Sequence, residues 1–287
     1  MRLSTLIIAL SMAGLVGCTE EIDFDLNDDG FVRLVVDAEL TNVHKRHKVA
    51  VSRTTSFYNN EVAPAVSGAK VEIRSANQVI PFTEDPTKPG TYYSTDSAAG
   101  EIGVEYILEI EVVDEIYTSV SKIGEVPNID SLSFENLRNK DGGPPFGREE
   151  DGPKEFFLMS MWFQESPTPD QQYMTLVYIN GKLDTDTVSE YTFFDDQILN
   201  GEYLDDIKFD VVEANYGDSV TIEMWSLQRA YYDGIFSLFR ETIYRGGLFD
   251  APPANVESNI NNGALGFFLT SGVTRRTIIL DPENEVK

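Results

Sequence analysis

The feature that most constrains this chain is an alternation of apolar and polar residues with a period of two. Residues 69–74 (Ala-Lys-Val-Glu-Ile-Arg) and 105–113 alternate in this way, as strands with one buried and one solvated face do. Further strand-like runs follow at residues 31–36, 48–54, 78–82, 91–93 and 116–120. Short strands at regular spacing without helices predict a β-sandwich. We therefore expect an Ig-like β-sandwich over residues 30–126.

Residues 127–287 are predicted to form a second β-rich domain with one packed amphipathic helix. Pro127-Asn128 interrupts the strand pattern, and residues 138–154 are polar and rich in Gly and Pro, which is typical of a loop or linker. The apolar run 156–163 is predicted to be a central strand. Asn180-Gly181 is a favoured hairpin turn, because both residues tolerate positive φ. The other expected strands are 209–213 and 219–225, forming a hairpin, and the closing strands 266–270 and 275–280.

The helix is expected near residues 227–245. Apolar residues recur there at helical spacing, Ser226 precedes them as a predicted N-cap, and Gly246-Gly247 follows as a stop signal. Gly234 lies inside this pattern and costs about 1 kcal/mol relative to Ala. Tertiary packing is therefore expected to stabilise this helix.

Residues 1–17 are predicted to be a signal peptide that is removed. An uncharged apolar run of 14 residues extends from Leu3 to Val16, and a helix of that length is too short for a hydrocarbon core of ~30 Å. The run ends in Leu15-Val16-Gly17-Cys18, which resembles the bacterial lipobox, and Cys18 is the only cysteine. The resemblance implies cleavage before Cys18 and acylation of this residue. Several acyl chains together give firm membrane attachment.

Residues 18–29 are predicted to be an acidic tether. Glu20, Glu21 and Asp23 resemble the surface-export signal of Bacteroidetes lipoproteins, which implies attachment to the outer membrane facing the cell exterior; a plain solvated linker is the alternative. The chain has 22 Lys+Arg against 48 Asp+Glu and a net charge of −26. We expect no nucleic-acid partner, because phosphates would be repelled, and the acyl chains rather than anionic headgroups would provide the attachment.

Asp25, Asn27 and Asp29, followed by Gly30, match the first half of an EF-hand loop. The twelfth position is Val36 instead of Glu, which removes the bidentate ligand of such a loop. A weak calcium site at these three residues is one hypothesis, and an acidic tether without metal is the favoured alternative. No other cofactor is expected.

Catalysis is the weaker functional class. The acidic pairs Asp195-Asp196 and Asp205-Asp206 could serve a glycosidase, but such pairs arise by chance in a chain with 48 acidic residues. His44 and His47 are expected in a solvated loop, and there is no Gly-x-Ser-x-Gly motif. Six aromatic residues are candidates for a ligand groove, although an interior position is favoured for them: Trp162, Trp225, Tyr231, Tyr232, Phe236 and Phe239.

The C-terminal part carries a family resemblance. Residues 252–260 read Pro-Pro-Ala-Asn-Val-Glu-Ser-Asn-Ile, and residues 263–268 read Gly-Ala-Leu-Gly-Phe-Phe. This tail resembles the ending of an uncharacterised Bacteroidetes outer-membrane lipoprotein family that is classed as a domain of unknown function. The resemblance implies association with TonB-dependent transporters and no known enzyme activity. The favoured interpretation of the motif itself is structural, because Gly, Asn and Pro clusters form turns.

These observations predict a surface-exposed outer-membrane lipoprotein that is not an enzyme. Its expected role is ligand binding or assistance in a TonB-dependent nutrient uptake system. The expected partners are the outer membrane, through acyl chains on Cys18, and a TonB-dependent receptor. The alternatives are a lipid-anchored hydrolase of glycans or peptides and a structural or adhesion protein of the cell surface.

Overall fold

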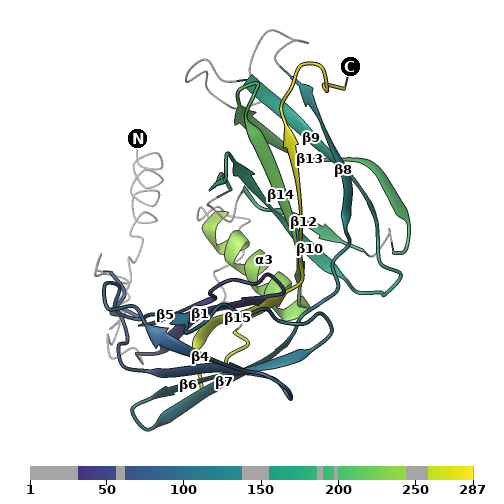
Figure 1. Cartoon of the computed structure of the whole chain (residues 1–287). Helices are drawn as coiled ribbons and strands as arrows, with labels where there is room; N and C mark the ends of the chain where they lie inside the picture. The colour runs from purple at the N-terminus through teal and green to yellow at the C-terminus, as the bar shows by residue number, and fades with distance from the viewer. Residues whose placement is uncertain are drawn as a thin grey trace, which may run out of the picture. The chain divides into compact units, whose positions relative to one another are not determined.

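The computed structural model describes residues 32–55, 62–137, 155–185, 190–196, 200–243 and 258–286 (Figure 1). The predicted fold class is confirmed, because this part of the chain is mainly β with a single helix. Cys18, the proposed calcium ligands Asp25, Asn27 and Asp29, and the predicted loop 138–154 lie outside these residues. No helix within the described ranges is both long and apolar enough to cross a membrane.

An eight-stranded sheet contains the N-terminal strands and one C-terminal strand. Its hydrogen-bonded order is β15 (Leu265–Ser271), β1 (Leu34–Thr41), β2 (Lys48–Arg53), β5 (Thr91–Ser94), β4 (Val79–Glu84), β3 (Lys70–Arg74), β6 (Glu105–Val112) and β7 (Glu115–Lys122). The run β1-β2-β5-β4 followed by β3-β6-β7 reproduces the ABED and CFG strand order of the Ig fold. The Ig-like character predicted from the alternation is therefore confirmed.

The alternating apolar residues of these strands share one core. In β1, Leu34, Val36, Ala38 and Leu40 are all buried, whereas the residues between them are more exposed. In β6, Leu108 and its alternate neighbours are buried in the same way. The alternation in the sequence therefore correctly predicts which face of each strand packs against the core.

One strand of this sandwich comes from the other end of the chain. β15 pairs with β1 in parallel, from Val35↔Leu265 to Thr41↔Ser271. Phe268 of β15 is fully buried in the sandwich core. The predicted closing strand at 266–270 is thus present, and it extends the sandwich beyond the contiguous range 30–126.

Two further sheets pack on a common core. The first has the order β13 (Tyr203–Ala214), β9 (Glu155–Gln164), β8 (Ile129–Asn136). The second has the order β11 (Lys182–Leu183), β10 (Gln172–Ile179), β14 (Ser219–Leu227), β16 (Val273–Ile279), with β12 (Thr192–Asp195) also paired to β10. Residues 156–163 form the central strand β9, as predicted. Phe157 and Met161 of β9 are buried in the same core as Ile222 and Met224 of β14.

The two hairpin predictions have opposite outcomes. Asn180 and Gly181 have φ values of 51° and 77° and connect β10 to β11, so the Asn-Gly hairpin is confirmed. The hairpin between 209–213 and 219–225 is wrong, because β13 pairs with β9 whereas β14 pairs with β10 and β16. A short polar turn between two strands occurs both in a hairpin and where the chain crosses between packed sheets. The sequence pattern alone therefore did not distinguish them.

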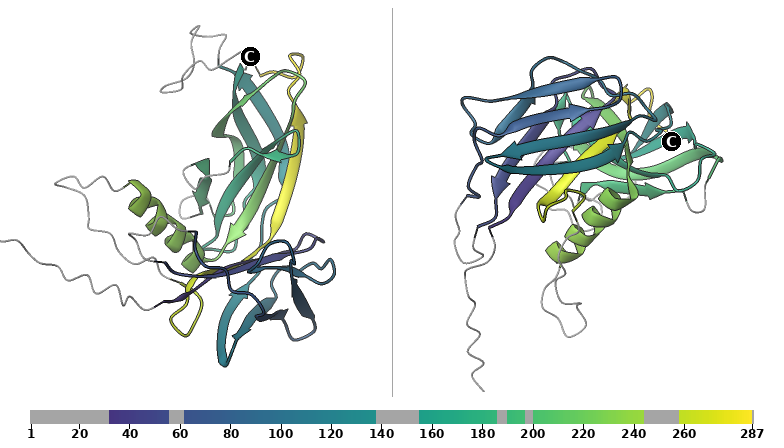
Figure 2. Two further views of the ribbon diagram at one scale, coloured as in Figure 1. Left: turned by 90° about the vertical axis from the view of Figure 1, so that its left-hand side faces the viewer. Right: turned by 90° about the horizontal axis from the view of Figure 1, so that it is seen from below.

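The predicted helix is confirmed as α3 (Arg229–Ile243). Tyr231 and Tyr232 pack against a cluster on β10 and β14 that includes Trp225, and α3 lies beside β15 in both views of Figure 2. β10 is covered on both faces, which explains why residues 172–177 are all buried. Ser226 does not cap the helix. It is a buried residue of β14, where its Oγ donates to Gly124 O (3.1 Å) and accepts from Gly272 N (2.8 Å).

Candidate functional site

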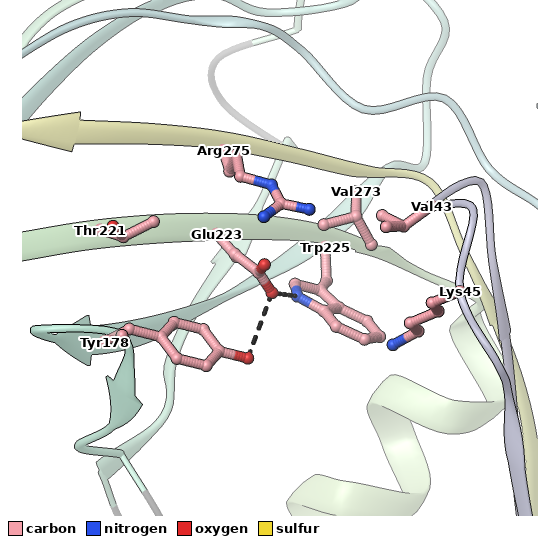
Figure 3. A pocket seen from close by; sticks show the side chains of 9 residues that line it. Val43, Lys45, Tyr178, Thr221, Glu223, Trp225, Val273 and Arg275 are labelled. Carbon is pink, nitrogen blue, oxygen red and sulfur yellow. Dashed lines mark hydrogen bonds between the residues drawn. The ribbon is translucent and has the colours of Figure 1, made fainter.

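A hollow of about 340 Å³ lies on the five-stranded sheet (Figure 3). Its lining residues in β14 alternate with Ile222 and Met224, which face the core shared with the three-stranded sheet, so the hollow is on the opposite face. Ligand pockets in proteins typically start at about 300 Å³. The loop after β1 forms one wall, and β10, β14 and β16 form the floor. The lining residues are Val43, Lys45, Tyr178, Gly181, Thr221, Glu223, Trp225, Val273 and Arg275.

Strand register explains how residues distant in sequence meet here. Glu223 of β14 lies opposite Arg275 of β16, and Trp225 lies opposite Val273. Tyr178 of β10 lies opposite Thr221. Because alternate residues of a strand share a face, these side chains all lie on one side of the sheet.

The carboxylate of Glu223 is the centre of the hollow. The Tyr178 hydroxyl donates to its Oε2 at 3.3 Å, and Trp225 Nε1 donates to the same oxygen at 3.1 Å (Figure 3). Neither of these bonds uses Oε1. Burial, followed by the neighbouring Glu223, raises the pKa of Tyr178 to about 12, so the phenol remains a donor at neutral pH. The carboxylate is therefore oriented by two donors through one oxygen, while the other oxygen has none of these bonds.

Two basic side chains also line the hollow. Lys45 Nζ lies 2.6 Å from Glu39 Oε1 and 5.5 Å from the centroid of the Trp225 ring, which combines an ion pair with a cation–π contact. Arg275 is exposed and extends toward Glu223 and Trp225 (Figure 3). Within the described residues, its guanidinium makes no hydrogen bond or ion pair. The guanidinium of Arg275 can therefore donate to a ligand, and Oε1 of the neighbouring Glu223 can accept from one.

Of the five aromatic candidates whose side chains the structure describes, Trp225 alone lines the hollow. Its side chain is 4% exposed, so the interior position favoured from the sequence is confirmed for this residue. Trp162 is half-buried and donates through Nε1 to Asp205 Oδ1. Tyr231, Tyr232 and Phe236 are half-buried along α3, and the side chain of Phe239 lies outside the described residues.

The residues of the two acidic pairs proposed for a hydrolase have different surroundings. Asp195 and Asp205 belong to β12 and β13, which lie in different sheets. Asp196 is buried, and its Oδ2 accepts from Gln171 N at 2.9 Å. Asp206 adopts φ 54° where the register of β13 shifts. Three of these four residues have structural roles. Asp196 and Asp205 accept hydrogen bonds from Gln171 and Trp162, and Asp206 lies at the irregularity of β13.

The two histidines differ in how far they are exposed to solvent. His44 is exposed, whereas His47 is fully buried with Nε2 at 3.0 Å from Ala98 O. The expectation of a solvated loop is therefore wrong for His47, because its ring is buried against the backbone of Ala98. Burial lowers the pKa of His47. Across the described ranges, no three His, Cys, Asp or Glu residues are grouped to hold a metal ion.

The described part of the tail motif has structural contacts. Asn259 donates through Nδ2 to Phe268 O (2.9 Å) and accepts at Oδ1 from Phe268 N (2.8 Å). Asn261 makes the equivalent pair with Thr118 of β7, accepting from its N at 2.7 Å and donating to its Oγ1 at 2.8 Å. These amides bridge β7 and β15, which supports the structural interpretation of residues 258–261. Residues 252–257 lie outside the described part of the chain.

Four residues of the hollow were not predicted from the sequence: Tyr178, Glu223, Arg275 and Lys45. One feature of the sequence could have identified Glu223. It is a charged residue on the face of β14 that also carries the buried apolar residues Trp225 and Leu227. A buried-facing charge in an alternating strand indicates a partner or a ligand. The partners come from strands β10 and β16, and their proximity is a property of the sheet order.

Comparison with known proteins gives one family. The family model described as "Domain of unknown function (DUF4249)" matches residues 19–277, a range that includes every residue lining the hollow. No curated protein matches the chain.

Proposed function

The chain belongs to the DUF4249 family, and from this premise we propose that it is a surface-exposed outer-membrane lipoprotein that binds a ligand for a TonB-dependent uptake system. The lipobox ending at Cys18 and the acidic residues after it support the location. The resemblance of the tail to lipoproteins associated with TonB-dependent transporters supports the partner.

The observation that carries the binding role is the hollow at Glu223. Its carboxylate is fixed by Tyr178 and Trp225, and Arg275 lies beside it with an open guanidinium. A few oriented polar groups on an apolar floor are typical of ligand sites. Tyr178 is the hydroxyl beside this carboxylate, and its pKa is raised to about 12, so it is held as a hydrogen-bond donor and not as an ionised nucleophile. The hollow therefore favours ligand capture over hydrolysis.

Membrane attachment is tested with a Cys18→Ser variant of the full chain, expressed in its native cell type. We expect the unchanged protein in the outer-membrane fraction, with a Cys18 peptide carrying acyl chains in mass spectrometry, and the variant in the soluble fraction. Thr19→Ser is the matched control, because it changes the neighbouring residue and leaves the thiol in place. Unchanged membrane attachment of the Cys18→Ser variant would contradict the anchor.

Orientation and partner need separate measurements. Protease treatment of intact cells is expected to remove the protein, whereas an internal periplasmic protein remains. Purification of the tagged full chain in mild detergent is expected to recover a TonB-dependent receptor with it. Recovery of the chain alone would count against the transport role, and an unchanged phenotype after deletion of the receptor gene would favour the structural or adhesion alternative.

A further inference from the structure

We propose that the hollow at Glu223 binds a neutral polyhydroxylated ring, that is, one saccharide unit of a ligand. This inference rests on the proposed ligand-binding function and adds the chemical class of the ligand. Four side chains carry it: Glu223, Arg275, Tyr178 and Trp225.

The hydrogen-bonding capacity of the hollow matches neighbouring hydroxyl groups. An ionised carboxylate only accepts and a guanidinium only donates, whereas each hydroxyl does both. Glu223 Oε2 already accepts from Tyr178 and Trp225, which leaves Oε1 for a ligand hydroxyl. Arg275 lies directly opposite Glu223 across the β14–β16 pair, and opposite residues in such a pair have Cβ atoms about 5 Å apart. Two adjacent hydroxyls of one ring can therefore bind both residues at once.

The charges of the hollow favour a neutral ligand. Lys45 is paired with Glu39 at 2.6 Å, so the remaining charges are the carboxylate of Glu223 and the guanidinium of Arg275. An anion placed near Arg275 would be repelled by Glu223, and a cation placed near Glu223 would be repelled by Arg275. A hydroxylated ring satisfies both groups without adding a charge to a partly buried site.

The floor and size of the hollow fit a ring with an apolar face. Trp225 and Val273 line the hollow with the small exposed part of their side chains, 4% and 8% of each residue, so carbon atoms form part of its surface. The volume of about 340 Å³ is near the lower end of known ligand pockets. This size matches one or two sugar rings.

The test uses the full chain with Trp162→Phe, which leaves Trp225 as the only remaining tryptophan of two. The protein is purified in an amine-oxide detergent, because glycoside detergents would compete for the site. Methyl α-glucoside, methyl β-galactoside, maltose and cellobiose are titrated while Trp225 emission is recorded. Saturation-transfer NMR on the protein with both tryptophans provides an independent measurement. We expect saturable binding of at least one of these sugars, with a dissociation constant on the order of 1 mM.

Matched variants assign the binding to the hollow. Glu223→Gln and Arg275→Lys are each expected to weaken binding about tenfold, which corresponds to loss of one charged hydrogen bond. Arg276→Lys is the control, since Arg276 is the exposed neighbour that does not line the hollow, and it is expected to change binding less than twofold. Thermal unfolding of each variant shows whether its fold is retained.

Three results would overturn the inference. The first is absence of saturable binding of all four sugars by both fluorescence and NMR. The second is binding of glucuronate but of no neutral sugar, because that result assigns the hollow to an anion. The third is equal weakening by Arg275→Lys and Arg276→Lys. If the protein is anchored and recovers a receptor but binds none of these sugars, the saccharide inference is wrong and the proposed transport role is unaffected. If it binds sugar but recovers no receptor, the transport role is wrong and the saccharide inference is unaffected.

Discussion

Gly234 of α3 lies so close to Phe267 of β15 that a Cβ atom at position 234 would overlap the aromatic ring. Phe267 also contacts Tyr231 one turn earlier in the helix, with ring centroids 5.3 Å apart and planes at 75°. The glycine that weakens the isolated helix therefore allows α3 to approach the strand that extends the Ig-like sandwich. Tertiary packing accounts for a residue that helix propensity disfavours.

Gly234→Ala is expected to destabilise the protein by about 1–3 kcal/mol, even though alanine is the better helix former by about 1 kcal/mol. The added methyl group has to displace the Phe267 ring or the helix. Urea unfolding followed by circular dichroism measures the change. Combining Gly234→Ala with Phe267→Leu is expected to recover part of the loss, and Ser237→Ala in the same helix is the control. A Gly234→Ala protein that is more stable than the original would show that the contact between Gly234 and Phe267 leaves room for a methyl group.

Asn259→Ala is expected to cost about 2–4 kcal/mol, because it removes two hydrogen bonds and leaves Phe268 N and O without their partner. The free energy of unfolding by urea tests this value. Asn284→Ala is the matched control, since Asn284 is exposed and its side chain makes no hydrogen bond to other described residues. Equal effects of the two substitutions would mean that the amide of Asn259 does not stabilise β15.

Gly266→Ala is expected to be far more costly than Gly217→Ala. Both glycines have positive φ, 96° and 95°, which costs a non-glycine residue on the order of 1–3 kcal/mol. At Gly266 a Cβ would also lie 2.8 Å from the Val36 carbonyl carbon and closer still to its oxygen, whereas at Gly217 nothing lies within 4 Å. The expected result is a soluble, moderately destabilised Gly217→Ala protein and little folded Gly266→Ala protein. Equal melting temperatures would contradict the close approach of β15 to β1.

The stability contributed by His47 is expected to depend on pH. Burial lowers the pKa of His47 in the folded chain below its ordinary value of 6.5, so the unfolded chain binds more protons in the window below pH 6.5. This contribution is present above pH 6.5 and is lost as the pH falls through the folded-state pKa. His47→Gln is therefore expected to remove part of the decrease in stability between pH 7.5 and pH 5.

His44→Gln is the control for this measurement, because His44 is exposed on the same loop. Thermal unfolding of the original protein and of both variants is compared at matched ionic strength, since the many acidic residues also titrate at low pH. A pH dependence that is the same in the His47→Gln protein and the original protein would show that folding does not lower the pKa of His47.

The strands were predictable because their signal is local. A period of two in residues 69–74 or 105–113 follows from the pleat and needs no knowledge of the partner strand. The positive φ of Asn180 and Gly181 is likewise a local property of these two residues. The pairing of residues 209–213 with 219–225 was not predictable in this way, since the same alternation suits a hairpin and a crossing between sheets.

The environments of single polar residues were harder to predict. Ser226 fits the pattern of a helix cap, yet β14 continues through Leu227 and its hydroxyl binds Gly124 and Gly272. His47 lies in a polar sequence, yet its ring is buried. In both cases the decisive neighbours are distant in sequence, and strand order brings them together.

The sequence pattern predicts mainly β structure with one helix near residues 227–245, because periodicity and turn residues act over a few positions. It also supplied the hypothesis of an acylated Cys18. The folded chain was needed to show that β15 joins the N-terminal sandwich. The same holds for the hollow that is lined by Glu223, Arg275, Tyr178 and Trp225. The reason is physical: register between β10, β14 and β16 sets these distances, and register depends on how whole sheets pack.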